Sequence, residues 1–303
     1  MSGYLTGLIV LLALNTIAAY GVYLPMAAGQ LNLGIAGFMA IGAYASAYLT
    51  NVCGWPALAA IAAGGGTAAI LAFVVAMPIL RTQGIYLSLA TFALGQVICA
   101  ILLNLEVVGG AAGYPVSTHI EASTVVAVTV VVVSLVYLMS TTRVPIYLAA
   151  VKNDPLVADL LGLNVKALGV AALTAGATIA GVGGALYAHY FNYVEAQYFG
   201  VMLSTYTVLY VLLGGTQSVL GPLVGAAIFT IVPEALRSSS QWRYAIFALF
   251  IILFMALRPQ MMAEVRRGME IITCDNCNRI LYYAASDSAP TNSSAAQPNV
   301  AIT

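Results

Sequence analysis

Charge is the scarcest property of this sequence. Only 7% of its 303 residues are charged, whereas 62% are hydrophobic, and the formal net charge is zero. Soluble domains carry charge on about a quarter of their residues, so this composition excludes an ordinary soluble domain. A neutral chain also gives no basis for nucleic-acid binding, which depends on clustered cations. The composition therefore predicts an integral membrane protein that contacts lipid and has no nucleic-acid partner.

Residues that carry chemistry are also few. The only lysines are Lys152 and Lys166, and no GxxxxGK[ST] motif occurs, so we expect no ATP binding of that type by this chain alone. The serine, histidine and acidic residues form no hydrolytic arrangement, and we expect no enzyme. No acidic residue falls near the centre of a predicted span, where ion-coupled carriers often hold one. An ion-coupled secondary transporter is therefore the alternative from a different class.

Long apolar stretches fill most of the sequence. They are about 20 residues each, which suits helices, because barrel strands would be about half as long and would alternate in polarity. We expect an all-α fold, a polytopic transmembrane bundle of about eight to ten spans that includes broken or re-entrant segments. The predicted spans are about 4–24, 35–50, 56–80, 85–105, 122–140, 171–190, an interrupted run at 202–236, and 244–257.

One long polar stretch, Thr141–Lys166, interrupts this pattern and holds five of the twenty charged residues. Its cations are Arg143, Lys152 and Lys166, whereas residues 82–142 contain none. Because short loops that carry cations stay on the cytoplasmic side, we expect residues 141–166 to face the cytoplasm and the loop after residue 105 to lie outside.

Within this stretch the pattern predicts a short amphipathic helix. Asp154 can cap free amides, Pro155 suits a first turn, and Gly162 is a typical stop. Leucines recur at helical spacing on one face while Asp159 turns elsewhere; these leucines are Leu156, Leu160 and Leu163. Such a face suits a groove on another protein. A connector packed on its own bundle is the alternative that the pattern leaves open.

Two predicted helical segments are interrupted, in opposite halves of the chain. The first break covers residues 25–34 and the second residues 214–222, and both are rich in glycine or proline. Paired breaks indicate a transport path near the middle of the membrane, although polar turns between helices would give the same pattern. The path residues that we predict are Gln30, Asn32, Gly34, Gly214, Gly215 and Gln217.

The sequence after residue 260 differs from the rest. We predict a transmembrane domain at 1–260, a cytoplasmic tail at 261–285 and a disordered tail at 286–303, which is rich in Ser, Ala, Asn and Pro. Cys274 and Cys277 have the spacing of one knuckle of a zinc ribbon, which is half of a four-ligand site. We predict that zinc, if bound, is shared with a second copy or a partner, and expect no other cofactor. A reduced pair of thiols is the alternative.

Several motifs occur together in a characteristic order: GQLNLGIAGFMAIGAYASA, IYLSLATFALGQV, LAAVKNDPLVADLLGLNV, GVGGALYAHYF, VLLGGTQSVLGPLVGAA and a closing LRPQ. Over most of residues 15–260 the chain resembles the permease subunits of ABC importers for branched-chain amino acids, together with their relatives that import urea and amides.

The resemblance implies a subunit of a bacterial inner-membrane importer. Its partners would be a second, homologous permease, two cytoplasmic ATPases and an external binding protein that delivers the solute. In that family the cytoplasmic loop is the coupling helix, a role that falls here on Asp154–Gly162. Amino acids are the expected cargo, with urea or an amide as the alternative. The CxxC tail departs from the family, and we expect the C-terminus to be cytoplasmic.

Overall fold

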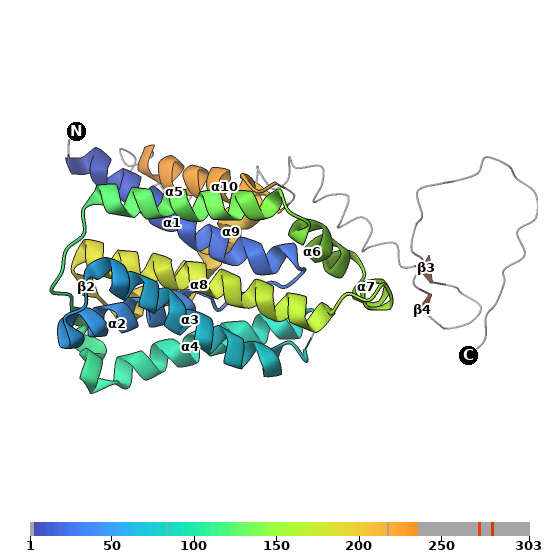
Figure 1. The fold of residues 1–303 in the computed structure, drawn as a ribbon, viewed down its shortest axis with the longest axis horizontal. Coiled ribbons are helices and arrows are strands. Elements are labelled where there is room, and N and C mark those ends of the chain that lie inside the picture. Colours follow the sequence, from blue (N-terminus) through green and yellow to red (C-terminus); the bar gives the residue numbers. More distant parts are fainter. Residues whose placement is uncertain (1–2, 83, 217, 236–271, 274–279, 282–303) are drawn as a thin grey trace, which may run out of the picture. The chain divides into compact units, whose positions relative to one another are not determined.

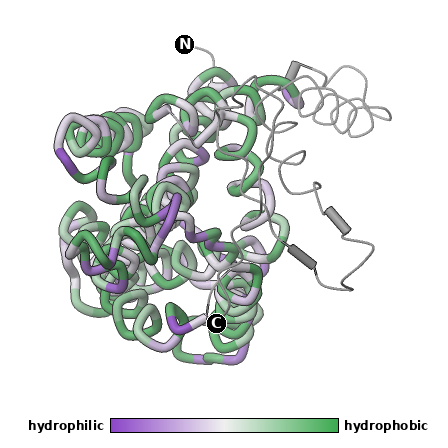
Figure 2. The backbone as a smooth tube through the Cα atoms, turned by 90° about the vertical axis from the view of Figure 1, so that its right-hand side faces the viewer, coloured by the Kyte–Doolittle hydropathy of each residue, from purple (hydrophilic) through white to green (hydrophobic). Residues whose placement is uncertain are grey.

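The computed structural model describes residues 3–82, 84–216, 218–235, 272–273 and 280–281. These residues belong to two units, Met1–Tyr244 and Ala245–Thr303. The first unit is a bundle of α-helices (Figure 1). Figure 2 shows that hydrophobic residues make up most of its helices and that hydrophilic stretches are short.

The longest helices are the apolar ones. They are α1 (Gly3–Ala27), α2 (Ile35–Cys53), α3 (Ala57–Ile79), α4 (Ile85–Asn104), α5 (Ala122–Ser140) and α8 (Val165–Phe191). These six helices are long and apolar enough to cross a membrane, and two shorter apolar helices follow, α9 (Val201–Gly214) and α10 (Gly221–Ala235). The predicted class, a helical multi-pass membrane protein with broken segments, is confirmed. The predicted last span, 244–257, lies outside the described residues.

Helix α8 lies at the centre of the bundle and packs against α1, α2 and α3. Close approach is possible because small residues face one another. A Cβ added to Gly21 of α1 would lie only 3.0 Å from the carbonyl oxygen of Gly176 in α8. One added to Gly181 would lie 2.5 Å from the Cβ of Ala68 in α3. The small residues of α8 therefore form a packing surface.

One end of the bundle is closed by a small pair of strands, and we call it the β1–β2 end. β1 (Tyr114–Pro115) pairs antiparallel with β2 (Tyr193–Val194), with Tyr114 opposite Val194. Three short 3₁₀ helices complete the connections: η1 (Glu106–Val108), η2 (Gly110–Ala112) and η3 (Ala196–Phe199). Asn51 of α2 fixes the loop on both sides, because its Nδ2 donates to the Pro115 carbonyl at 2.6 Å and its Oδ1 accepts from Ser117 N at 2.9 Å.

The other end carries α6 (Val144–Asn153) and α7 (Pro155–Leu160), and we call it the α7 end (Figure 1). The sequence predicted one short helix in this stretch, at residues 154–162, and the structure has a second one before it. The segment is helical because Pro145 occupies the first turn, and because Leu148 and Val151 recur at helical spacing and are both buried.

The first helix also ends later than predicted, at Ala27 instead of near Pro25. A proline removes one helical hydrogen bond and its ring crowds the residue four positions earlier. Here that residue is Gly21, and the ring of Pro25 lies against Gly176 of α8, where a Cβ would be 2.7 Å from Cδ of the proline. The small residues on both sides therefore let the helix continue through Pro25.

The second unit is described only at two short strands. β3 (Ile272–Thr273) pairs antiparallel with β4 (Ile280–Leu281), with Ile272 opposite Leu281 and Thr273 opposite Ile280. Cys274 and Cys277 fall between the strands in sequence and lie outside the described residues, as does the tail at 286–303.

Candidate coupling and translocation site

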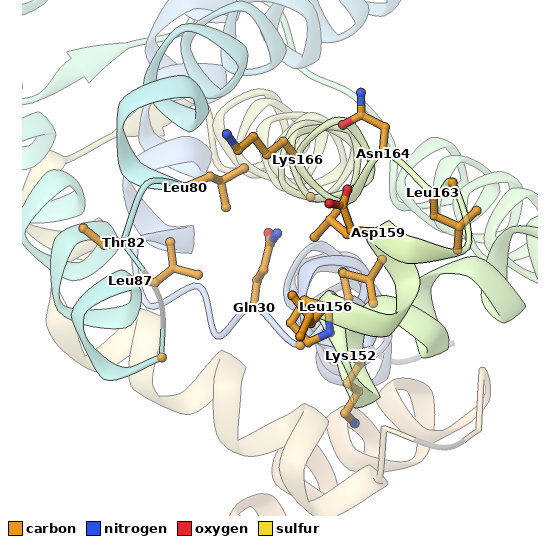
Figure 3. A pocket seen from close by; sticks show the side chains of 18 residues that line it. Gln30, Leu80, Thr82, Leu87, Lys152, Leu156, Asp159, Leu163, Asn164 and Lys166 are labelled. Atoms are coloured by element: carbon orange, nitrogen blue, oxygen red, sulfur yellow. The ribbon is translucent and has the colours of Figure 1, made fainter. Parts of the chain in front are cut away.

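A hollow of about 910 Å³ opens at the α7 end, between segments that are far apart in the sequence. Its walls come from the first break at residues 28–30, the turn between α3 and α4, the α6–α7 region and the first turns of α8. Figure 3 shows Gln30 projecting into this space, with Leu156 and Asp159 of the α7 segment nearby. The predicted cytoplasmic loop and the first predicted break therefore line one cavity.

Helix α7 is short, and both of its ends are closed by local hydrogen bonds. Oδ1 of Asp154 accepts from the backbone N–H groups of Leu156 at 2.9 Å and of Val157 at 3.1 Å, as expected for an N-cap. At the other end Gly162 adopts a φ of +85°, and Gly162 N and Leu163 N donate to the carbonyls of Asp159 and Ala158. This is a Schellman ending, which favours glycine at this position.

The apolar face of α7 is exposed in the isolated chain. Leu156, Leu160 and Leu161 are 72%, 80% and 75% exposed, while Ala158 on the opposite side is 1% exposed and seats the helix on the bundle. Asp159 lines the hollow, and so does Leu156 at the start of α7. Leu163, which the spacing placed on the leucine face, is half-buried, because the glycine turn at residue 162 redirects the chain, and Leu161 takes its place.

The first break lies inside the bundle, not at its edge. Leu33 N donates to Oγ1 of Thr91 in α4 at 3.1 Å, and Gly34 N donates to Oδ1 of Asn32 at 2.9 Å. Gly34 has no room for a side chain, because a Cβ would collide with the carbonyl of Thr91. Helix α2 therefore begins beside the second turn of α4.

The beginning of α9 meets the beginning of α2. Oγ of Ser204, in the first turn of α9, accepts from Ala36 N at 3.1 Å. The contact satisfies one of the free amides at the start of α2, which has no side-chain cap of its own. Two helix N-termini thus lie side by side within the bundle, an arrangement typical of discontinuous helices in transporters.

Two amide side chains of the first break keep unused hydrogen-bonding atoms. Oε1 of Gln30 and Nδ2 of Asn32 are buried and have no partner within the described residues. The residues are 9% and 0% exposed. Gln30 fits between the break and α8 because residue 169 is a glycine, where a Cβ would overlap Nε2 of Gln30. A buried polar atom without a partner is costly, so these atoms favour contact with a polar solute or water.

The second break is the turn between α9 and α10. Gly214 and Gly215 lie against Gly221, where a Cβ on Gly221 would be 2.9 Å from the Gly214 carbonyl oxygen. Gln217 lies outside the described residues. The two predicted breaks meet at α6: Gly29 of the first packs against Lys152, and Thr216 of the second lies 3.4 Å from Nζ of the same lysine.

Metal ligands do not gather in the described part of the chain, where no group of three or more His, Cys, Asp or Glu side chains could hold an ion. His189 is fully buried and makes a 2.9 Å hydrogen bond through Nδ1 with the Thr118 hydroxyl. Cys53 is exposed, and the buried Cys99 thiol donates to the Ala196 carbonyl at 3.1 Å.

The fold and this site define the class of protein, a multi-pass helical membrane protein with interrupted helices inside its bundle. Residues 4–257 match the family model described as the permease component of a branched-chain amino acid transport system. Because this match spans most of the chain, the chain belongs to that family, which is one of transport permeases. Residues 254–281 also match the model of a C4-type zinc ribbon domain.

Two curated relatives are similar to the chain. Both are described as the high-affinity branched-chain amino acid transport system permease protein LivM, one from Escherichia coli (strain K12) and one from Salmonella typhimurium (strain LT2). They are 27% and 26% identical, over 79% of this chain in each case. The chain spans only 65% of the length of each relative. No solved structure matches the chain.

Proposed function

We propose that this chain is the membrane-spanning permease subunit of an ATP-driven importer for branched-chain or other amino acids. It would work with a second, homologous permease, two cytoplasmic ABC ATPases and an external binding protein. The observation that carries the proposal is the exposed leucine face of α7 on a chain that has no phosphate-binding loop. A transport permease of this kind must obtain its energy from another subunit, and α7 offers the surface on which one can dock.

In this proposal the coupling residues divide into two groups. Leu156 and Leu160 enter an apolar groove of the ATPase, while Asp154, Pro155 and Gly162 fix the ends of the helix so that the face is presented as a rigid element. Asp159 lines the hollow, so a movement of the bundle would change the surroundings of its carboxylate. The full coupling set is Asp154, Pro155, Leu156, Asp159, Leu160 and Gly162.

The translocation path would pass the first break. The free donor on Asn32 suits the carboxylate of an amino acid, and the free acceptor on Gln30 suits its ammonium group. The N-terminal ends of α2 and α9 carry partial positive charge and favour the same anionic group. Gly34, Gly214, Gly215 and Gln217 would complete the path. Urea or an amide would also match these uncharged side chains and is the alternative cargo.

The proposed location is the bacterial inner membrane, with the α7 end and the C-terminus in the cytoplasm. The three cations of residues 143–166 support this orientation, because cations are retained inside. In a variant freed of its natural cysteines, Ser117→Cys should react with an impermeant reagent in intact cells, whereas Asn153→Cys should react only after permeabilisation. Labelling of both positions in intact cells would contradict this orientation, because it would place both residues outside. The permease domain would end near residue 260, before the cytoplasmic tail at 261–285.

The tail would hold zinc only together with another chain. A C4-type site needs four thiolates, but the matched residues 254–281 contain only Cys274 and Cys277. The strand pair β3–β4 brackets these cysteines in sequence, as expected for one knuckle. Deleting residues 274–303 should leave uptake intact and remove zinc from the purified assembly. An assembly that contains no zinc would identify the cysteines as plain thiols.

Reconstitution tests the main proposal. Purified alone, the chain should not hydrolyse ATP. Combined with its second permease, ATPases and binding protein in proteoliposomes, it should take up an amino acid only when ATP is present. A panel that includes leucine, isoleucine, valine, urea and amides would identify the cargo. Uptake by the chain alone under a proton or sodium gradient would instead support a secondary transporter.

A further inference from the structure

We propose that Lys152 is the positioning residue that links the coupling helix α7 to both broken segments of the bundle. The proposal rests on the proposed importer function, because it assigns the route by which a movement of α7 reaches the breaks. Its basis is the place of one lysine among three segments, at the α7 end of the first unit (Figure 3).

Lys152 moves with α7 because the two helices are joined through one residue. Asp154 N donates to the Ala150 carbonyl at 3.1 Å and so ends α6, while Oδ1 of the same residue caps α7. No flexible segment separates the helices. A shift of α7 is therefore passed to the last turn of α6, where Lys152 lies.

The first contact of Lys152 is with the first break. Gly29 adopts a φ of +79°, and a Cβ built there would lie 3.2 Å from Cα and 3.3 Å from Cγ of Lys152. The backbone of the break thus rests directly on the stem of the lysine. Next to it, Leu148 of α6 packs with Ala28 and with Ala172 of α8. A displacement of α6 presses on the segment that carries Gln30 and Asn32.

The second contact is with the second break. Nζ of Lys152 donates to Oγ1 of Thr216 at 3.4 Å, and Thr216 follows Gly215, the C-cap of α9. The C-terminal end of a helix carries partial negative charge, so an ammonium group is stabilised there. In Figure 3 the amine of Lys152 points away from Gln30. The aliphatic stem of Lys152 thus contacts the first break at Gly29, and its ammonium group contacts the second break at Thr216.

The two contacts can be separated by substitution. Lys152→Met keeps a flexible stem on Gly29 but loses the ammonium group, and Thr216→Val removes the acceptor at similar size. Lys152→Arg keeps the charge and the donors. Arg143→Met removes a cation at the opposite end of α6 from Lys152 and is the matched control. Each variant is assembled with the second permease, ATPases and binding protein, and uptake and ATP hydrolysis are measured together in proteoliposomes.

We expect Lys152→Met and Thr216→Val each to lower the solute taken up per ATP hydrolysed by about five- to tenfold, with ATPase binding retained. The double variant should lose no more than either single one, because both remove the same interaction. Lys152→Arg and Arg143→Met should keep the parental ratio. A merely structural lysine would change assembly levels and leave this ratio unchanged.

An unchanged ratio in Lys152→Met, or fully multiplicative losses in the double variant, would overturn the link. If Lys152→Met fails to assemble, the ratio of uptake to ATP hydrolysis in Thr216→Val tests the link, because this variant leaves the lysine and its packing in place. An unchanged ratio in Thr216→Val would then overturn the link. If the parental assembly shows no ATP-driven uptake, the importer function itself fails. The three outcomes are distinguishable because the parental ratio is measured first.

Discussion

The two ends of the bundle hold their connecting segments in opposite ways. At the β1–β2 end, Asn51 and the strand pair join loops from different parts of the chain, and Tyr193 donates its hydroxyl proton to the Ala112 carbonyl. At the α7 end, α7 is closed by its own caps and leaves three leucines exposed. The first end is closed upon itself, whereas the second displays an apolar surface that water does not favour.

In the proposed importer, this difference would decide where movement enters the molecule. A segment fixed by hydrogen bonds to several helices resists displacement, whereas a capped helix that is seated mainly by Ala158 can shift as a rigid element. The α7 end also contains the hollow and both breaks, so a shift there reaches the buried amides of Gln30 and Asn32. Substitutions at the two ends should therefore have effects of different kinds.

The largest effect should come from Leu160→Arg at the α7 end. Loss of one buried leucine contact costs about 2 to 5 kcal/mol, which is about 30-fold or more in affinity, and an unpaired cation in the groove adds to this. We expect ATPase capture and solute uptake to collapse while membrane insertion is unchanged.

Asp159→Asn, at the neighbouring position of α7 that lines the hollow, is the control for this substitution and should have a smaller effect. If Leu160→Arg inserts and transports at the parental rate, α7 is only a connector, and the contrast between the two ends has no functional meaning.

A second prediction concerns the buried amide next to the hollow. Gln30→Met keeps the length of the side chain but removes Oε1, which has no partner within the described residues. The thermal stability should not fall, because the change removes the unsatisfied atom, whereas uptake should decrease by about tenfold. Uptake and the midpoint of thermal unfolding are measured on the same preparation. A fall in stability with unchanged uptake would mean that Gln30 is structural.

The smallest effect on transport should come from the β1–β2 end. Asn51→Ala removes two hydrogen bonds that fix residues 115–117 and should lower the free energy of unfolding by about 1 to 2 kcal/mol. The ratio of uptake to ATP hydrolysis should stay at the parental value. Thermal unfolding of the purified permease measures the first quantity, and proteoliposomes measure the second. A coupling defect in Asn51→Ala would show that both ends take part in energy transfer.

Much of the fold was predictable because lipid permits few alternatives. Residues 122–140 are rich in β-branched side chains, yet only a helix satisfies their backbone in a membrane, and α5 has the predicted bounds. Asp154 and Gly162 were recognisable because capping is local chemistry that depends on a few neighbouring residues.

Long-range contacts were not predictable in this way. Nothing in the sequence places Ser204 beside Ala36, or Thr216 beside Lys152, because these pairs are separated by 168 and 64 positions. Helix α6 had a local signal, Pro145 with Leu148 and Val151 at helical spacing, but the predicted helix began only at Asp154. The pairing of the two breaks through one lysine became visible only in the structure.

Cross-linking from the exposed face of α7 tests the central claim most directly. A photoreactive side chain is placed at Leu160, or at the exposed Val107 near the β1–β2 end, and the complete importer is illuminated in native membranes. The account predicts a covalent product between Leu160 and the ATPase, and no ATPase product from Val107. An ATPase product from Val107, or none from Leu160 in an assembly that takes up solute with ATP, would contradict it.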